Sequence, residues 1–148
     1  MASVVVYGTA LDGILKGDIS LDDGTVGCLL TTTINAIDHS DSSVADVLAT
    51  ETELVHGSYS RQTQSVTGSN VSRSGSAVTF DLSDVVFPTL SGSDIELAIL
   101  YKATGTGGHA SSDSSRRVLA YVDLDGPISL SGSDVTIEWN ASGVFRIS

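Results

Sequence analysis

The chain has 148 residues with 7 basic and 18 acidic side chains, which gives a formal net charge of −11. This length favours a single domain, and a hydrophobic fraction of 41% argues against wholesale disorder. So acidic a chain has no electrostatic attraction for phosphate, which disfavours a nucleic-acid-binding protein, and a single cysteine excludes an internal disulfide.

The N-terminal segment is apolar but short. It has no basic n-region and no long h-region, so we expect no signal peptide, and no apolar run in the sequence approaches the roughly 18 residues of a membrane span. Residues 1–7 could act as a docking arm, because an exposed strand can add to the edge of a partner's sheet. The candidate protein-interface residues of this arm are Val4, Val5, Val6 and Tyr7. Alternatively, the arm completes the domain's own sheet.

Two short helices are expected. Residues 7–16 carry apolar side chains at helical spacing, and Gly17 can end the helix. The side chains expected on its apolar face are Ala10, Leu11, Ile14 and Leu15. A second helix can begin from a cap at Asp41 or Ser42. Its apolar residues are Val44, Val47 and Leu48.

Apolar and β-branched runs separated by glycine, serine and aspartate predict strands along the rest of the chain. The expected strands are residues 25–32, 54–64, 65–72, 77–82, 95–102 and 118–124. The first of these is largely buried, with Gly27 as a weak point inside it. In residues 77–82 the side chains alternate, with Val78, Phe80 and Leu82 on one face.

The C-terminal region predicts a hairpin of residues 135–139 and 144–147, whose turn contains Asn140 and Gly143. Residues 104–115 form a long Gly/Ser loop that we expect to be mobile. Strands at this spacing with few helices predict a mainly β fold: an antiparallel β-sandwich or a barrel-like single domain with one or two short helices. This β-rich domain would span residues 1–148.

Residues that could carry chemistry are scattered. The three histidines, His39, His56 and His109, lack the paired spacing of a zinc site. Cys28 lies in an apolar run without a neighbouring base, which predicts a small buried side chain rather than a nucleophile. No Ser/His/Asp motif stands out. We therefore predict a non-enzymatic protein without catalytic, cofactor-binding or metal sites.

Two kinds of loop resemble binding motifs only in part. Residues 105–108, Gly-Thr-Gly-Gly, lead into a strand and not a helix, and lack the Gly-Lys-Ser/Thr of a phosphate loop. The aspartate-rich turns at residues 22–24 and 123–126 lack the twelve-residue pattern of a calcium loop, although an incidental Ca²⁺ site stays open. The basic pair Arg116 and Arg117 suits either an acidic partner or a solvated strand end.

Residues 7–19, Tyr-Gly-Thr-Ala-Leu-Asp-Gly-Ile-Leu-Lys-Gly-Asp-Ile, resemble the start of a family of small virion proteins of tailed viruses. That family opens with a Tyr-Gly helix and a Gly-x-Ile turn, followed by an Asp-containing turn and an apolar strand that ends in threonines or serines. The further segments similar to the family are residues 21–25, 26–32, 99–102, 119–123 and 135–144. Residues 33–75 depart from its pattern.

The resemblance implies a virion structural protein, either a capsid decoration protein or a minor capsid protein on the outer face of the shell. Its partners would be the major capsid protein and copies of itself, with neither a nucleic acid nor a membrane, and it would be made in the host cytoplasm. A trimer is expected from shell geometry and not from particular residues. A tail or tail-tip component is the alternative.

Two other classes of protein stay open. A carbohydrate- or receptor-binding module would need exposed aromatic side chains, for which Tyr59 and Trp139 are the candidates, although Trp139 lies in a strand expected to be buried. A secreted enzyme or toxin would need a pocket lined by groups with shifted pKa values. Scarce lysine beside abundant aspartate fits a high-salt host, and a GC-rich genome explains the scarce lysine equally well.

Overall fold

The structure is a computed structural model that describes residues 3–148. Its strands in this range are β1 (Ser3–Val6), β2 (Thr25–Thr31), β3 (Gln62–Ser65), β4 (Val71–Ser74), β5 (Ala77–Phe80), β6 (Val85–Leu90), β7 (Ile95–Thr104), β8 (Val118–Ile128), β9 (Ser133–Ile137) and β10 (Phe145–Ile147). Its helices are α1 (Gly8–Lys16) and α2 (Val44–Val47), with 3₁₀ turns η1 (Gly68–Asn70) and η2 (Asp113–Ser115). The predicted mainly β fold with antiparallel sheets and two short helices is confirmed.

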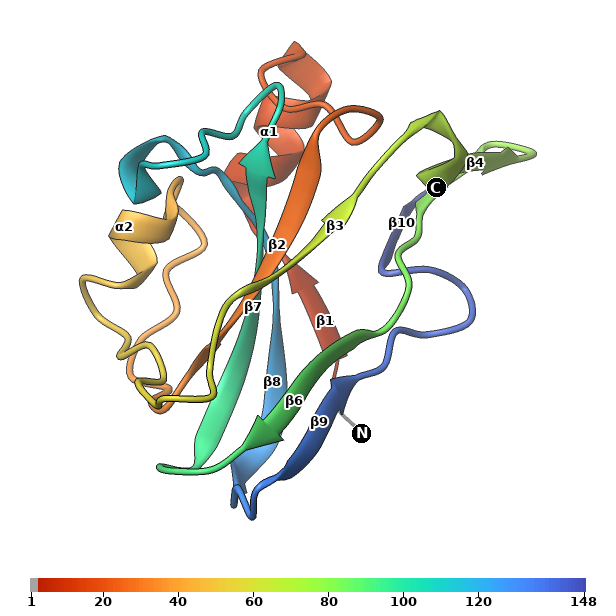
Figure 1. The fold of residues 1–148 in the computed structure, drawn as a ribbon. Coiled ribbons are helices and arrows are strands. Elements are labelled where there is room, and N and C mark those ends of the chain that lie inside the picture. Colours follow the sequence, from red (N-terminus) through yellow and green to blue (C-terminus); the bar gives the residue numbers. More distant parts are fainter. Residues whose placement is uncertain (1–2) are drawn as a thin grey trace.

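Three sheets share the strands. The main sheet has the order β1-β8-β7-β2-β3, a small sheet has the order β10-β5-β4, and a third consists of β6 and β9. Figure 1 shows β6 and β9 crossing in front of the lower half of the main sheet, while the small sheet lies beside its upper half, near the C-terminus. None of the helices within residues 3–148 is long and apolar enough to cross a membrane.

The centre of the main sheet is buried on both faces. Every residue of β7 from Leu97 to Ala103 is buried, and the neighbouring β2 is buried from Val26 onward. Phe87 and Leu90 from β6 join the same core as Val44 of α2. A strand covered on both faces has no polar side, so its sequence reads as a continuous apolar run. This explains why the strands at residues 25–32, 95–102 and 118–124 could be predicted.

Gly27 provides space for a ring. A Cβ built at Gly27 would lie 2.3 Å from Cζ of Tyr101, which is its register partner on β7. Tyr101 is buried against β2 at this point. The glycine predicted as a weak point is therefore a packing requirement, since any larger side chain would displace the Tyr101 ring.

Helix α1 follows the prediction except at Leu15. Gly17 ends the helix in the left-handed region with φ of 81°, and its N–H donates to the Ile14 carbonyl. Ala10 is buried and Ile14 partly buried, but Leu15 is 81% exposed. Five residues at about 100° each turn Leu15 roughly 140° away from Ala10, so the prediction that it shares the apolar face is wrong.

Helix α2 begins after the predicted caps, because neither Asp41 nor Ser42 caps it. Its cap is Ser43, whose hydroxyl accepts from the Asp46 N–H, while the Asp46 carboxylate accepts from the N–H groups of Ser42 and Ser43. The pKa of Asp46 is lowered chiefly by the backbone hydrogen bond from Ser42, and next by the side-chain hydrogen bond with Ser43 of the capping box. Val44 and Val47 are buried as expected.

Two predicted polar strands are largely wrong. In residues 54–64 only the end from Gln62 is a strand, because the chain turns where the Tyr59 N–H donates to the His56 carbonyl. In residues 65–72 the 3₁₀ turn η1 intervenes, capped by the Thr67 hydroxyl and the Asn70 amide. That turn redirects the chain from the main sheet to the small one.

The predicted C-terminal hairpin is also wrong. Strand β9 pairs with β6, whereas β10 pairs with β5, so residues 138–144 connect two different sheets. Trp139 holds the start of this crossing, because its indole N–H donates to the Ser83 carbonyl at 2.9 Å. The Val144 N–H donates to the Phe80 carbonyl at its end.

The loop at residues 104–115 was expected to be mobile, but side chains fasten it to the body. Asp23 accepts from both the N–H and the hydroxyl of Thr106. Arg116 donates to the carbonyls of His109 and Ala110 inside the loop. The glycine-rich loop thus has hydrogen-bond partners elsewhere in the chain that its own sequence does not show.

Candidate functional site

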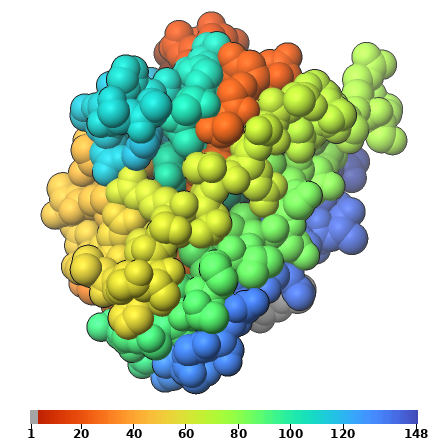
Figure 2. All heavy atoms as spheres, viewed as in Figure 1, coloured from red at the N-terminus to blue at the C-terminus, as the bar shows by residue number. Residues whose placement is uncertain are grey.

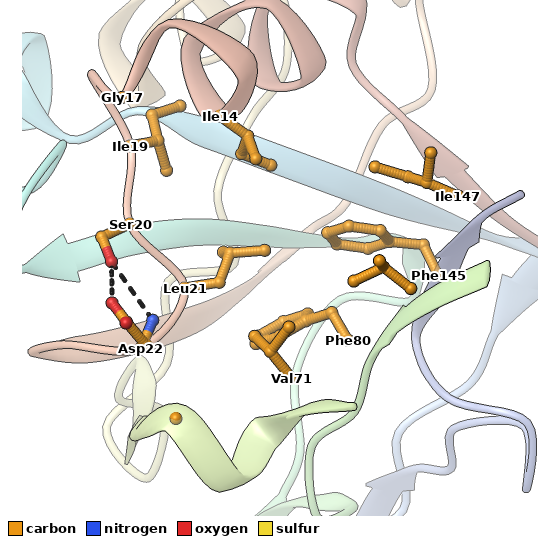
Figure 3. A pocket seen from close by; sticks show the side chains of 12 residues that line it. Ile14, Gly17, Ile19, Ser20, Leu21, Asp22, Val71, Phe80, Phe145 and Ile147 are labelled. Atoms are coloured by element: carbon orange, nitrogen blue, oxygen red, sulfur yellow. Dashed lines mark hydrogen bonds between the residues drawn. The ribbon is translucent and has the colours of Figure 1, made fainter. Parts of the chain in front are cut away.

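A groove of about 520 Å³ lies between the small sheet and the segment that links α1 to β2. Figure 3 shows side chains from both walls pointing into it, with Ile14 and Ile19 on one side and Phe80 and Phe145 on the other. The remaining lining residues are Gly17, Ser20, Leu21, Asp22, Gly68, Val71, Val78 and Ile147. The lining is mainly apolar, with Ser20 and Asp22 hydrogen-bonded to each other at its rim.

Strand register explains the apolar wall of the small sheet. Phe80 is the partner of Val71 on one side and of Phe145 on the other, so these three side chains form one row across the sheet. The rings of Phe80 and Phe145 have centroids 5.2 Å apart. A second row places Val78 between Arg73 and Ile147. The predicted alternation of Val78 and Phe80 thus gives the groove its wall, although the pairing that builds it was not predicted.

The candidate interface residues Val4, Val5 and Val6 lie in β1, which pairs antiparallel with β8 at the edge of the main sheet. The arm therefore completes the domain's own sheet. These three valines are partly exposed, whereas Tyr7 is fully buried, with its ring centroid 5.5 Å from that of Tyr121. Any interface formed by this segment would use the valines and their backbone and not the Tyr7 side chain.

The outer edge of β1 follows from its hydrogen-bonding pattern. The Tyr7 N–H donates to the Leu119 carbonyl at 3.0 Å, so the alternation of an antiparallel ladder directs Val5 toward β8. The backbone groups of Val4 and Val6 then point away from β8. Within residues 3–148 no strand pairs with that side of β1.

A network of four charged side chains joins the loop at residues 104–115 to the main sheet. Arg61 contacts Glu53 at 2.6 Å and Asp113 at 2.7 Å, and Asp113 also contacts Arg116 at 2.8 Å. Both guanidinium groups lie 5.7 Å from the centroid of the Tyr101 ring. Hydrogen bonding to Arg61 is the main cause of the lowered pKa of Asp113. The network fastens η2 and gives the predicted basic residue Arg116 a structural role.

Lys102 is a charged residue whose side chain has no exposed surface. Its side chain is fully buried in the central strand, and its ammonium donates to Oδ1 of Asp23 at 3.0 Å and to the Asp23 carbonyl. The Lys102 hydrogen bond is the largest cause of the lowered pKa of Asp23, ahead of Thr106. The aspartate-rich turn and the glycine-rich loop thus meet at this carboxylate. They bind each other there through hydrogen bonds from Lys102 and Thr106.

The other predicted chemical residues are dispersed. His56 contacts Ser58 and Ser91, His109 contacts Ser111, and His39 lies beside the rings of Tyr7 and Tyr121. Across residues 3–148 no group of three or more histidine, cysteine or acidic side chains could hold a metal ion.

Cys28 is fully buried, and desolvation raises the pKa of its thiol to about 12. Protonated at neutral pH, such a thiol is a poor nucleophile. Its position in β2 agrees with the prediction of a small packed side chain.

The two aromatic candidates for carbohydrate binding are engaged within the domain. The Tyr59 hydroxyl donates to Glu53 and accepts from the Leu30 N–H, and its ring stacks on Phe87 at 6.0 Å. Trp139 follows β9 and is partly exposed, so the expectation that it lies inside a buried strand is wrong.

The groove and the two charged clusters were missed from sequence because each joins residues far apart in the chain. Lys102 and Asp23 are 79 residues apart, and Arg61 and Asp113 are 52 apart. One local signal was available: a lysine inside the apolar run 95–102 must find a partner when the strand is buried. No protein-family model matches this chain, and no curated protein or solved structure shows significant similarity to it.

Proposed function

We propose that this chain is a non-enzymatic virion structural protein, a capsid decoration or minor capsid protein that binds the outer face of the shell. The segments that resemble the virion family support this proposal because they are neighbours in space. Residues 7–32 contain α1 and β2, and residues 99–102 and 119–123 lie in the adjacent strands β7 and β8. These segments belong to the main sheet and the helix beside it, whereas the similar residues 135–144 lie in β9 and the connection that follows it.

The observation that carries the proposal is the apolar edge strand β1. Exposed sheet edges are usually protected by charged residues, proline or a bulge, and the sequence Ser-Val-Val-Val contains neither a charge nor a proline. At the other edge of the main sheet, β3 is polar, and the Gln64 amide donates across to the Ser83 carbonyl. Strand β1 is therefore the edge suited to accept a strand of the major capsid protein.

Attachment through the β1 edge would stabilise the assembled shell. Contacts that exist only on the assembled shell stabilise that state by linkage, and many copies bound side by side raise the effective affinity. An interface of about 1,600 Å² is sufficient for stable binding. The acidic surface of the bound copies would keep particles soluble and apart.

Shell binding by purified protein tests this proposal. Shells assembled without the protein are mixed with it and sedimented, and the melting temperature of the shells is measured. We expect co-sedimentation and a higher melting temperature. Val4→Pro removes an outward N–H without breaking the ladder to β8, so this variant should lose binding, whereas Val4→Thr keeps that N–H and should bind.

Three results would contradict the proposal. They are no sedimentation of the protein with shells, sedimentation with tails only, and binding of Val4→Pro as tight as that of the unchanged protein. The second result would favour the tail or tail-tip role. Urea unfolding of each variant confirms that a loss of binding does not reflect a loss of folding.

A further inference from the structure

Exposed apolar side chains lie on one wall of the groove. Val78 and Ile147 are partners across the small sheet, with 39% and 42% of their surface exposed at the groove wall. Leu15, which is 81% exposed, lies in sequence between the lining residues Ile14 and Gly17. The groove thus has an apolar projection beside an apolar hollow.

The two walls of the groove carry opposite charge. On the small sheet, Arg73 shares the groove face with its register partner Val78, whereas Arg146 alternates with the lining residues Phe145 and Ile147 and lies on the opposite face. Neither arginine forms an ion pair with any residue from 3 to 148, whereas four of the other basic residues do: Lys16, Arg61, Lys102 and Arg116. The facing wall carries an exposed carboxylate at Asp22, and a second exposed carboxylate, Asp18, lies in sequence between the lining residues Gly17 and Ile19.

A surface with these features is complementary to a second copy of itself. We propose that two copies associate around a two-fold axis beside the groove, so that each copy places Leu15 in the groove of the other. The same rotation brings Arg73 of each copy to the acidic wall of its partner, Asp18 and Asp22. In a two-fold contact the same patch serves both subunits, which requires that it contain both the hollow and the projection.

The arrangement of the small sheet favours this pairing. Figure 2 shows the turn between β4 and β5 projecting from the body of the domain, so the groove wall that carries Arg73 extends beyond the main sheet. A partner copy can therefore reach it without approaching β1. A two-fold pair also differs from the trimer expected from shell geometry, because the groove, and not shell symmetry, determines it. This inference stands apart from the proposed virion role.

Charge exchange between two variants tests the pairing directly. Arg73→Asp makes both walls acidic, and Asp22→Lys places a lysine opposite Arg73, so each variant alone should dissociate. In a mixed pair, the aspartate introduced at position 73 of one variant meets the lysine introduced at position 22 of the other, and the second contact keeps the original pairing of Arg73 with Asp22. The mixture should therefore form a heterodimer. Sedimentation velocity over a concentration series measures all three samples.

Serine substitutions of exposed apolar residues provide a second test of the pairing. Leu15→Ser should weaken the dimer at least tenfold, because an anchoring side chain is lost from both contacts. Val55→Ser is the matched control, since Val55 is 90% exposed and lies outside the groove lining, and it should leave the dimer unchanged. Urea unfolding of each variant separates lost association from lost folding.

The proposal is overturned if the unchanged protein is a monomer at every concentration or forms a trimer. It is also overturned if Leu15→Ser dimerises as well as Val55→Ser, or if the mixed charge variants fail to pair. None of these measurements requires shells, so the result is independent of shell binding through β1.

Discussion

Substitution of Lys102 and substitution of its partner Asp23 should change the stability of the fold by different amounts. The Lys102 side chain has no exposed surface, whereas the Asp23 side chain is 43% exposed. If the lysine is removed, the aspartate can be solvated by water where it stands. If the negative charge is removed, the ammonium is left buried without a counter-ion. The same ion pair should therefore have very different effects on stability depending on which partner is changed.

The expected magnitudes follow from this difference in exposure. Asp23→Asn preserves the shape of the side chain and should lower the free energy of unfolding by about 3 kcal/mol, near the lower end of the range for a broken buried ion pair. Lys102→Met fills the space of the lysine stem and removes the charge, so it should cost about 1 kcal/mol or less. The double variant should resemble Lys102→Met. The coupling in this double-mutant cycle would then equal the cost of Asp23→Asn in magnitude, about 3 kcal/mol.

Urea unfolding at neutral pH, followed by the fluorescence of Trp139, measures each cost. Lys16→Met is the control, because Lys16 is 63% exposed and its partner Asp12 is 59% exposed, so this variant should unfold at nearly the same urea concentration as the unchanged protein. Equal costs for Asp23→Asn and Lys102→Met would refute the reasoning. So would a double variant that is less stable than either single variant.

Three further predictions concern stability and reactivity. The pKa values of Asp23 and Asp113 are lowered in the fold, so their contribution is complete above the ordinary carboxyl pKa of roughly 4 and is lost as the pH falls through the lowered values. The urea midpoint of the unchanged protein should thus fall steeply as the pH is lowered below about 4, and the midpoint of Asp113→Asn should fall less steeply. The same dependence on pH in both proteins would argue against this role for Asp113. Gly27→Ala should lower the free energy of unfolding by about 1–3 kcal/mol, measured in urea, because the added Cβ displaces the Tyr101 ring. Gly57→Ala is the control and should be nearly neutral, since a Cβ at Gly57 meets nothing within 4 Å. Similar costs for the two variants would contradict the packing argument. Cys28 should not react with a thiol reagent until urea unfolds the chain, and rapid reaction in the folded protein would show that the thiol is accessible.

Local sequence patterns were sufficient for the three central strands of the main sheet and for the bounds of α1. Strands β2, β7 and β8 are long apolar runs because neighbours cover them, and this property is visible in the sequence. The end of α1 was visible as well, since Gly17 adopts a left-handed conformation that glycine favours.

The sequence did not show which strands pair with each other. Strand β10 has three residues, and nothing within them indicates that Phe145 pairs with Phe80 on β5 and not with the nearby β9. The hairpin was predicted because adjacent strands usually pair, but residues 138–144 cross to another sheet. The groove depends on this long-range pairing, so it could not be predicted from periodicity alone.

The most direct test of the proposed virion role is a cryo-electron microscopy reconstruction of tailed-virus particles from the source of this chain. We expect density for the domain on the outer face of the head, with β1 lying antiparallel or parallel to a strand of the major capsid protein. A particle whose head lacks this density, or one in which β1 faces solvent while another surface holds the domain, would contradict the account.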